Sequence, residues 1–278
     1  MFNLQNRFFV ERFLLDNSWS GDQLRQQRRW RSPDRQYLAS MFTHIYRNKL
    51  LVAVILLMAF AFPPKKKIKV WLIGDSTMCT YETNKAPITG WGMPFVNFFD
   101  SSVVIDNRAR GGRSTRTFLS ENRWQPIADS LQEGDYVFIQ FGHNDEAKEL
   151  QYAARYTSVP DYKINLIKFI TKTRAKKANP VIITPVTRMK FDKDSKQQET
   201  HVEYTAACYE IAKQYNVPLI DLDKKSRELL QQFGAENAKL LFMQYEPGED
   251  PHYPEGQKTI LTLMILVQEK LQSLFCRE

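Results

Sequence analysis

Hydrophobic and polar positions along residues 68–233 fall into blocks with two different periods. Short apolar runs predict strands at 70–73, 103–106, 136–141, 181–184 and 217–222. Between them, segments with apolar positions three or four residues apart predict helices at 124–131, 162–178, 201–215 and 224–233. Because strands that alternate with helices form a parallel sheet covered on both faces, we expect a three-layer α/β/α sandwich with a central parallel sheet.

The amino-terminal part of the chain contains one long uncharged segment, the twelve-residue run 50–61. This run is too short to cross a membrane comfortably, follows basic residues and ends in the small residues Ala59 and Ala61. The layout predicts a secretory signal at 41–61, starting at Met41 and cleaved near Ala61, and therefore a periplasmic or secreted protein without stable membrane insertion. The alternative is a signal anchor with residues 1–49 in the cytoplasm.

The remaining boundaries follow from composition. Residues 1–40 are rich in Arg and Gln and lack a hydrophobic period, which is typical of a misplaced start or a disordered extension. Residues 62–67 form a basic linker, and residues 68–278 form one domain with an aberrant tail at 259–278.

The net charge of +8 belongs mainly to the amino-terminal segment. Residues 1–61 hold nine Lys and Arg and four Asp and Glu, which leaves 30 bases and 27 acids, a net charge of +3, for residues 62–278. We therefore expect no nucleic-acid partner. The three cysteines have no CxxC spacing, so we expect neither a disulfide framework nor a metal site.

Three predicted strands end in polar groups. Ser76 lies in GDSTM after the first strand, Gly112 in NRARGGRSTRT after the second, and Asn144 in QFGHND after the third. The carboxyl ends of parallel strands meet at one edge of a sheet. A serine, a glycine N–H and an asparagine amide are the parts of an acyl-transfer site. Each also has a structural alternative: a helix cap for Ser76 or Asn144, a plain turn for the glycines, and a packed loop position for His143.

Together, GDSTM, GGRST and GHND resemble the GDSL or SGNH hydrolase superfamily, and within it the rhamnogalacturonan acetylesterase branch. The resemblance covers roughly residues 69–256 and includes the segments GWG at 90–92 and TPVTR at 184–188. It implies a flavodoxin-like SGNH fold, with Ser76 as the nucleophile and with Gly112 and Asn144 in the oxyanion hole.

The same resemblance implies an activity and a substrate. We expect a monomeric serine esterase that removes acetyl groups from an acetylated polysaccharide or oligosaccharide of the rhamnogalacturonan or pectin type, with no metal and no cofactor. Trp91, Arg113 and His143 are candidate substrate-binding residues, and Arg113 could equally make structural ion pairs.

One block of the family pattern is missing. The family has a D-x-x-H block near the carboxyl terminus, in which the histidine is the general base for serine, but this chain has none. The fallback base is His252, with Glu249 or Asp250 as its partner. Residues 259–270, TILTLMILVQEK, can be encoded by codons that read DNTHFNDTGARK one nucleotide back. We therefore expect a frameshift near codon 258 that impairs the enzyme, the alternative being a genuine apolar carboxyl-terminal helix.

Other classes of function stay open from the sequence. A catalytically inactive glycan-binding relative would keep the fold without the base. A membrane-anchored interaction protein would use residues 50–61 as its anchor. A lipase or thioesterase would use the same scaffold on other esters.

Overall fold

The structure is a computed structural model, and it describes residue 49 and residues 66–263, with side chains up to residue 259. The predicted extension 1–40, the signal or anchor 41–61 and most of the tail 259–278 lie outside the described residues. Of the helices in the described part, none is both long enough and apolar enough to cross a membrane.

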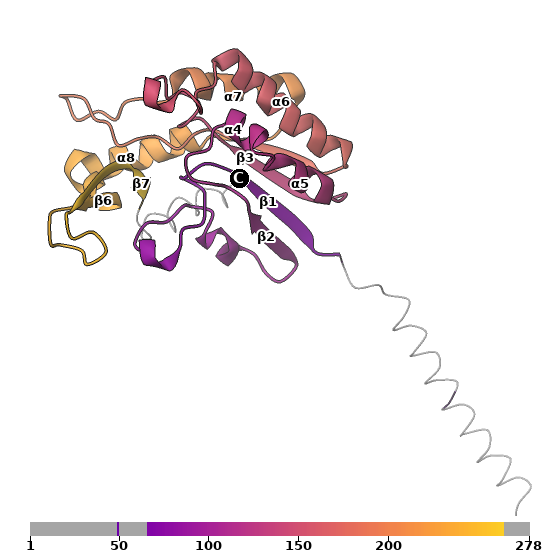
Figure 1. The fold of residues 1–278 in the computed structure, drawn as a ribbon, viewed down its shortest axis with the longest axis horizontal. Coiled ribbons are helices and arrows are strands. Elements are labelled where there is room, and N and C mark those ends of the chain that lie inside the picture. The colour runs from indigo at the N-terminus through magenta and orange to yellow at the C-terminus, as the bar shows by residue number, and fades with distance from the viewer. Residues whose placement is uncertain (1–48, 50–65, 264–278) are drawn as a thin grey trace, which may run out of the picture. The chain divides into compact units, whose positions relative to one another are not determined.

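A five-stranded parallel sheet forms the centre of the domain (Figure 1). Its strand order is β2-β1-β3-β4-β5. The strands are β1 (Ile68–Gly74), β2 (Val103–Asn107), β3 (Tyr136–Gln140), β4 (Asn179–Ile183) and β5 (Leu219–Ile220). The chain thus moves outward from β1 in both directions, and β1 and β3 end side by side, with Gly74 paired to Gln140.

Helices cover both faces of the sheet, which confirms the predicted three layers (Figure 1). One layer holds α4 (Thr115–Ser120), α5 (Trp124–Ser130), α6 (Val159–Ala175) and α7 (Val202–Tyr215). The other holds α8 (Leu222–Ala238) and the 3₁₀ segment η3 (Pro94–Phe98). Successive side chains of β1 point to opposite layers, so Trp71 and Ile73 join the first core and Val70 and Leu72 the second.

Side-chain caps set several helix boundaries. The Ser158 side chain accepts from Asp161 N, so α6 begins three residues before the predicted start. The Asp221 side chain accepts from Lys224 N, which begins α8 at Leu222 and leaves only two residues for β5. Helix α7 ends at Asn216 in the left-handed conformation.

Other elements differ from the sequence prediction. The segment after Ser76 is a turn, so the alternative of Ser76 as a helix cap is wrong, and residues 115–120 form a helix where no element is predicted. Strands β6 (Phe242–Tyr245) and β7 (Gln257–Leu263) pair antiparallel, so the alternative of a carboxyl-terminal helix over 259–270 is wrong for its described part, residues 259–263. Single 3₁₀ turns complete the described chain: η2 (Thr83–Lys85), η4 (Leu150–Tyr152) and η5 (Lys239–Leu241).

Candidate active site

Ser76 lies in a tight turn directly after β1, at the carboxyl-terminal edge of the sheet. The Asp75 carbonyl accepts from Met78 N at 3.3 Å and from Cys79 N at 3.0 Å, which closes the turn. The Tyr81 hydroxyl donates to the Ser76 carbonyl at 3.1 Å. The Ser76 side chain is half-buried, and within the described residues its hydroxyl makes no hydrogen bond. Its backbone is thus held in place while its hydroxyl stays available for chemistry.

Asp75 is fully buried beneath this turn. One carboxylate oxygen accepts from Thr77 N at 2.9 Å and from the Thr77 hydroxyl at 2.7 Å. Burial raises the pKa of Asp75 to about 6, despite the two bonds from Thr77 that oppose the shift. The carboxyl therefore holds the turn in place through its two bonds with Thr77.

Trp91 continues the same buried network. Its Nε1 donates to Gln140 Oε1 at 2.5 Å, and Gln140 Nε2 donates to the Thr77 hydroxyl at 2.6 Å. The Trp91 side chain is 0% exposed and packs edge-to-face on Phe95. The sequence suggested Trp91 as a substrate contact, but the structure places it inside the core, where it supports the turn.

The glycine loop passes directly over Ser76. Arg110 N donates to the Gly74 carbonyl at 2.9 Å, which continues the pairing with β1 past the last residue of β2. A Cβ on Gly111 would lie 3.7 Å from Ser76 Cβ, and Gly112 has a φ of +78°, a conformation that favours glycine. Arg113 braces the loop, because its Nη1 donates to the Gly111 carbonyl at 2.9 Å.

Asn144 arrives at the same edge from β3. Its Nδ2 donates to the Arg113 carbonyl at 3.0 Å, so the third polar strand end is tied to the glycine loop. The turn before it needs glycine, because Gly142 has a φ of +148° and a Cβ there would overlap Pro185. The structure therefore brings Ser76, Gly112 and Asn144 together, as the motif positions predicted.

Asp145 anchors the glycine loop from the far side. Its carboxylate accepts from Thr115 N at 3.0 Å and from the Thr115 hydroxyl at 2.6 Å, at the first turn of α4. Burial raises the pKa of Asp145 to about 7. The last residue of the GHND motif is thus a structural link between β3 and α4.

A buried pair of histidines lies behind Asn144. The rings of His143 and His201 meet edge-to-face at 4.1 Å, and His201 Nδ1 lies 2.9 Å from Glu146, which also pairs with Arg188. Burial, followed by the influence of His201 and Arg188, holds the pKa of His143 well below its ordinary value. Among the described residues, neither ring nitrogen of His143 has a hydrogen-bond partner. His143 is therefore a neutral, enclosed ring rather than an exposed substrate contact.

Glu146 keeps its charge within this cluster. Burial would raise its pKa, but the hydrogen bond from His201 and the nearby Arg188 outweigh that effect and lower it. The pairing of His201 with Glu146 could not be predicted from the sequence, because the two residues are distant in the chain and share no local motif.

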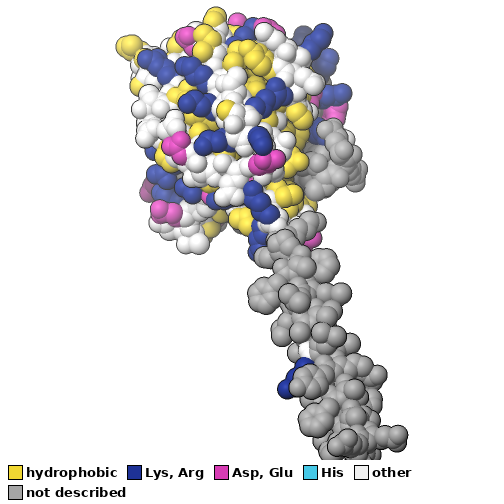
Figure 2. All heavy atoms as spheres, turned by 90° about the vertical axis from the view of Figure 1, so that its right-hand side faces the viewer, with side chains coloured by type: hydrophobic (Ala, Val, Ile, Leu, Met, Phe, Trp, Pro, Cys, Tyr) yellow, Lys and Arg dark blue, Asp and Glu magenta, His cyan; other side chains and the backbone are white. Residues whose placement is uncertain are grey.

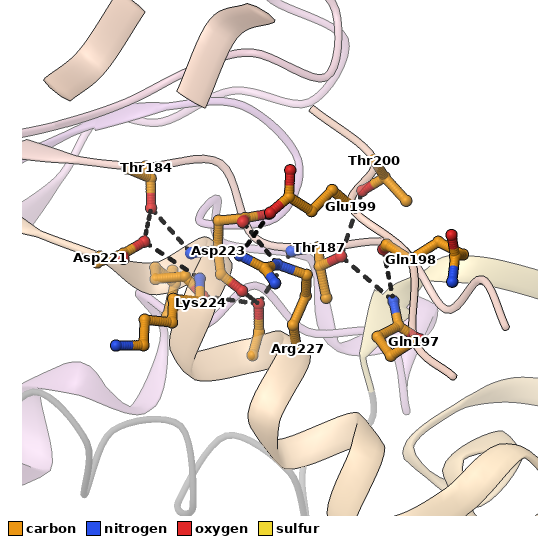
Figure 3. A network of polar contacts seen from close by, with 12 residues as sticks. Thr184, Thr187, Gln197, Gln198, Glu199, Thr200, Asp221, Asp223, Lys224 and Arg227 are labelled. Carbon is orange, nitrogen blue, oxygen red and sulfur yellow. Dashed lines mark hydrogen bonds and ion pairs between the residues drawn. The ribbon is translucent and has the colours of Figure 1, made fainter. Parts of the chain in front are cut away.

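Figure 3 shows the polar network that holds the fourth segment at this edge, residues 184–188. The Thr184 hydroxyl donates to Asp221, and Asp223 N donates back to that hydroxyl at 2.8 Å. Gln197 Nε2 donates to the Arg188 carbonyl at 2.7 Å. The buried Asp223 carboxylate pairs with Arg227 at 2.8 Å. These contacts position Arg188 against Glu146 and so support the buried histidine pair next to Asn144.

The fallback base lies in a different environment. His252 is in the connection between β6 and β7, its side chain is 47% exposed, and its Nδ1 lies 3.4 Å from Asp250 Oδ1. Asp250 also accepts from His252 N at 2.8 Å, a local turn contact. Within the described residues, no hydrogen bond joins His252 to Ser76. The connection reaches residues 83–85, since the Tyr253 hydroxyl donates to the Lys85 carbonyl at 2.8 Å.

The arrangement can stabilise a negative oxygen next to a nucleophilic hydroxyl. Asn144 Nδ2 carries two N–H groups and uses one on the Arg113 carbonyl, so the second is free to bind an oxyanion. In the part of the chain that the structure describes, no group of three or more His, Cys, Asp or Glu side chains is arranged to hold a metal ion.

Several known proteins are similar to this chain in sequence. The sequence pattern of the GDSL-like Lipase/Acylhydrolase family matches residues 72–245. The chain is 40% identical over 192 residues to rhamnogalacturonan acetylesterase RhgT of Bacillus subtilis (strain 168), which covers 69% of this chain and 81% of that protein. It is 36% identical over 178 residues to the probable rhamnogalacturonan acetylesterase YesY of the same organism, which covers 63% and 79%.

Solved structures share the fold. A catalytic mutant of Axe2, an acetylxylan esterase from Geobacillus stearothermophilus, matches with a TM-score of 0.57 at 16% identity, over 78% of this chain and 95% of that one. A Bacillus subtilis protein matches with a TM-score of 0.63 at 24% identity, over 77% of this chain and 56% of that one. The pattern match across most of the domain shows that the chain belongs to the GDSL-like lipase/acylhydrolase family and is, by this homology, a carboxylic ester hydrolase.

Proposed function

We propose that the chain is a serine acetylesterase of acetylated rhamnogalacturonan, with Ser76 as its nucleophile. The observation that carries the proposal is the meeting of Ser76, the glycine loop and Asn144 at one sheet edge, tied by the 3.0 Å bond from Asn144 to Arg113. The relatives named rhamnogalacturonan acetylesterases support the choice of substrate.

In the proposed reaction the Ser76 oxygen attacks the carbonyl carbon of the acetyl group. The N–H groups of Gly112 and Ser76 and the amide of Asn144 stabilise the oxyanion that forms. The bond from the acetyl carbon to the sugar oxygen then breaks, and that oxygen takes up the proton lost by Ser76. Water attacks the resulting acetyl-enzyme, releases acetate and returns a proton to the Ser76 oxygen.

We also propose that this chain is impaired, because none of the histidines in the described part of the structure is placed to take the Ser76 proton. The sequence holds four histidines. His143 and His201 are buried against each other, and His252 is exposed and held only by a local contact with Asp250. The remaining one, His44, lies outside the described residues. Loss of the base leaves catalysis by the oxyanion hole alone, slower by orders of magnitude.

Acetate release from acetylated rhamnogalacturonan tests both proposals. Residues 62–278 as written are compared with a version in which DNTHFNDTGARK replaces residues 259–270. We expect the restored version to release acetate at least about 10³-fold faster. Inactivity of both versions on this polymer, with activity on acetylated xylan, would reject the substrate. Equal activity of both versions would reject the impairment.

A variant of His252 tests whether this residue is the base, should the two versions be equally active. If the written chain is active and His252→Ala abolishes that activity, His252 is the base. If the written chain binds acetylated oligosaccharide without turnover, the alternative of an inactive glycan-binding relative is favoured.

Export is a separate part of the proposal. It follows from the signal-like run 50–61 and predicts a mature amino terminus near Phe62 when the full chain is expressed. Amino-terminal sequencing of the exported protein is the test, and a retained segment 41–61 would favour the anchor instead.

A further inference from the structure

A groove outside the candidate active site lies between α5 and the edge strand β2. Its volume is about 270 Å³, slightly below the range of about 300–1,000 Å³ typical of drug-sized ligands. It is lined by Trp71, Arg108, Arg123, Pro126, Ile127 and Ser130. None of Ser76, Gly112 and Asn144 lines it, so it is distinct from the acyl-transfer site.

The groove exists because α5 covers β1 but not β2. Ile127 of α5 is buried in the same core cluster as Trp71 of β1. Trp71 pairs in register with Asp106, and Lys69 with Val104, so these side chains share one face of the sheet. Val104 on β2 is 40% exposed. The face of β2 beside α5 therefore stays open to solvent.

One side of the groove carries excess positive charge. The Asp106 carboxylate is shared by two cations, with Lys69 Nζ at 2.7 Å and Arg108 Nε at 2.5 Å. Lys69 Nζ also lies 3.7 Å from the centre of the Trp71 ring. The two cations hold the pKa of Asp106 below its ordinary value, although burial opposes the shift. Asp106 is therefore ionised and neutralises only one of them.

The other side repeats this arrangement. The Glu121 carboxylate is shared by Arg123 Nε at 2.5 Å and Arg113 Nε at 3.0 Å. Arg123 lines the groove, while Arg113 braces the loop over Ser76. A third carboxylate, Asp135, accepts from Trp71 Nε1 at 3.3 Å. The two sides together therefore hold four cations and three carboxylates, so a net charge of +1 runs from the groove to the active-site loop. Figure 2 shows one face of the molecule, on which Lys and Arg side chains are spread among apolar and acidic ones.

We propose that this groove binds a hexuronate unit of an acidic polysaccharide, whose carboxylate lies between Arg108 and Arg123. Guanidinium N–H groups form strong hydrogen bonds with carboxylates. Arg108 uses Nε and Nη2 on Asp106, and Arg123 uses Nε on Glu121, so within the described residues Nη1 of Arg108 and both Nη atoms of Arg123 are left to donate to a ligand carboxylate. The exposed Pro126 offers apolar surface for the CH groups of a sugar ring, and the volume suits one such ring. The inference rests on the proposed function, since it takes the substrate to be an acidic polymer.

The position of the groove suits a polymer that also reaches Ser76. Residues 108–112 run from the groove to the loop above Ser76, with Arg108 N bonded to the Leu72 carbonyl and Arg110 N to the Gly74 carbonyl, both at 2.9 Å. A uronate in the groove would thus hold one part of the chain while a neighbouring acetylated sugar enters the active site.

Calorimetric titration of the full chain tests this proposal without turnover. The probes are a rhamnogalacturonan oligosaccharide without acetyl groups and the same oligosaccharide with its carboxyl groups reduced to alcohols. We expect the acidic probe to bind at least about ten-fold more tightly than the reduced one. The double variant Arg108→Gln/Arg123→Gln should lose about that factor for the acidic probe alone.

Two further variants make the test specific. Ser130→Tyr fills the groove without changing its charge and should also weaken binding. Lys163→Gln removes one cation on α6, where it pairs with Glu210, and should leave the affinity unchanged. Thermal unfolding checks that each variant is folded. If the double variant does not fold, the affinity of Ser130→Tyr for the acidic probe decides whether the groove binds it.

Equal binding of the two probes, no binding, or unchanged affinity in the folded groove variants would overturn the inference. Acetate release by the restored chain is measured in parallel on acetylated polymer. If the restored chain releases acetate but the groove variants bind the oligosaccharide normally, only the groove proposal is rejected. If the groove variants weaken binding of the oligosaccharide but the restored chain releases no acetate, only the proposed activity is rejected.

Discussion

The Asn144 amide donates a hydrogen bond to the Arg113 carbonyl at 3.0 Å, which joins the end of β3 to the loop after β2. Both elements flank β1, whose end carries Ser76. This single bond therefore fixes the distance between two of the proposed oxyanion donors, because Arg113 directly follows Gly112.

Removing the Asn144 amide should slow acetyl transfer with little effect on binding. In the restored chain, Asn144→Ala should lower kcat by about 10²–10³-fold, the usual cost of one oxyanion donor. Asn179→Ala is the matched control, since Asn179 is exposed at the opposite end of the strands. Steady-state kinetics on an acetylated oligosaccharide gives the result, and an equal loss in both variants would contradict the assigned role.

The left-handed conformation of Gly112 gives a second prediction. Gly112→Ala should lower the free energy of unfolding by about 1–2 kcal/mol and also reduce kcat, because the strain lies in the oxyanion loop. Gly134→Ala imposes similar strain, since its φ is +86° and its Cβ would meet nothing within 4 Å, but it lies in a turn before β3. Denaturant unfolding with kinetics should show similar stability losses and a rate loss only at Gly112. A rate loss at both positions would disconnect the loop geometry from catalysis.

Two buried tryptophans differ in their hydrogen bonding, and their variants should differ accordingly. Trp91→Phe leaves Gln140 Oε1 without its donor and should cost about 1–3 kcal/mol beyond the change in packing. Trp124→Phe removes an Nε1 that has no partner among the described residues, so it should cost less. Chemical denaturation compares the two. Unchanged stability with a raised KM in Trp91→Phe would instead restore Trp91 as a sugar contact.

His143 predicts how stability depends on pH. Because burial keeps its folded pKa well below the ordinary 6.5, the unfolded chain takes up a proton below pH 6.5 and the folded chain does not. As the pH is lowered below 6.5, His143 should therefore decrease the free energy of unfolding by up to about 1.4 kcal/mol per pH unit. Between pH 6.5 and 5, His143→Gln should lose less stability than the parent chain. Parallel pH dependence in the two proteins would contradict this assignment.

Much of the fold could be predicted because the sheet is parallel and buried. Apolar runs placed the first four strands within a few residues, and the chain order produced the α/β/α layers. Helix α4 escaped because it has six residues and no apolar period, although Ser114 and Thr117 form a capping box. The β6–β7 pair escaped because an apolar run suits a strand or a buried helix equally.

The site residues that follow strand ends could be predicted from the sequence. Those whose role depends on how deeply tertiary packing buries them could not. Ser76, Gly112 and Asn144 follow three strands, so topology alone brings them together. Trp91 stands between two glycines, which suggests an exposed loop, yet tertiary packing encloses it. The contact between His143 and His201 depends on where α7 begins against β3, which no local pattern encodes.

The most direct test of the account is acetate release by the restored chain with and without the Ser76 hydroxyl. The account predicts that Ser76→Ala lowers the rate on acetylated rhamnogalacturonan by about 10⁴-fold or more, while Ser120→Ala, at an exposed serine of α4, has no effect. Retention of the full rate by a folded Ser76→Ala protein would contradict the central claim that Ser76 is the nucleophile.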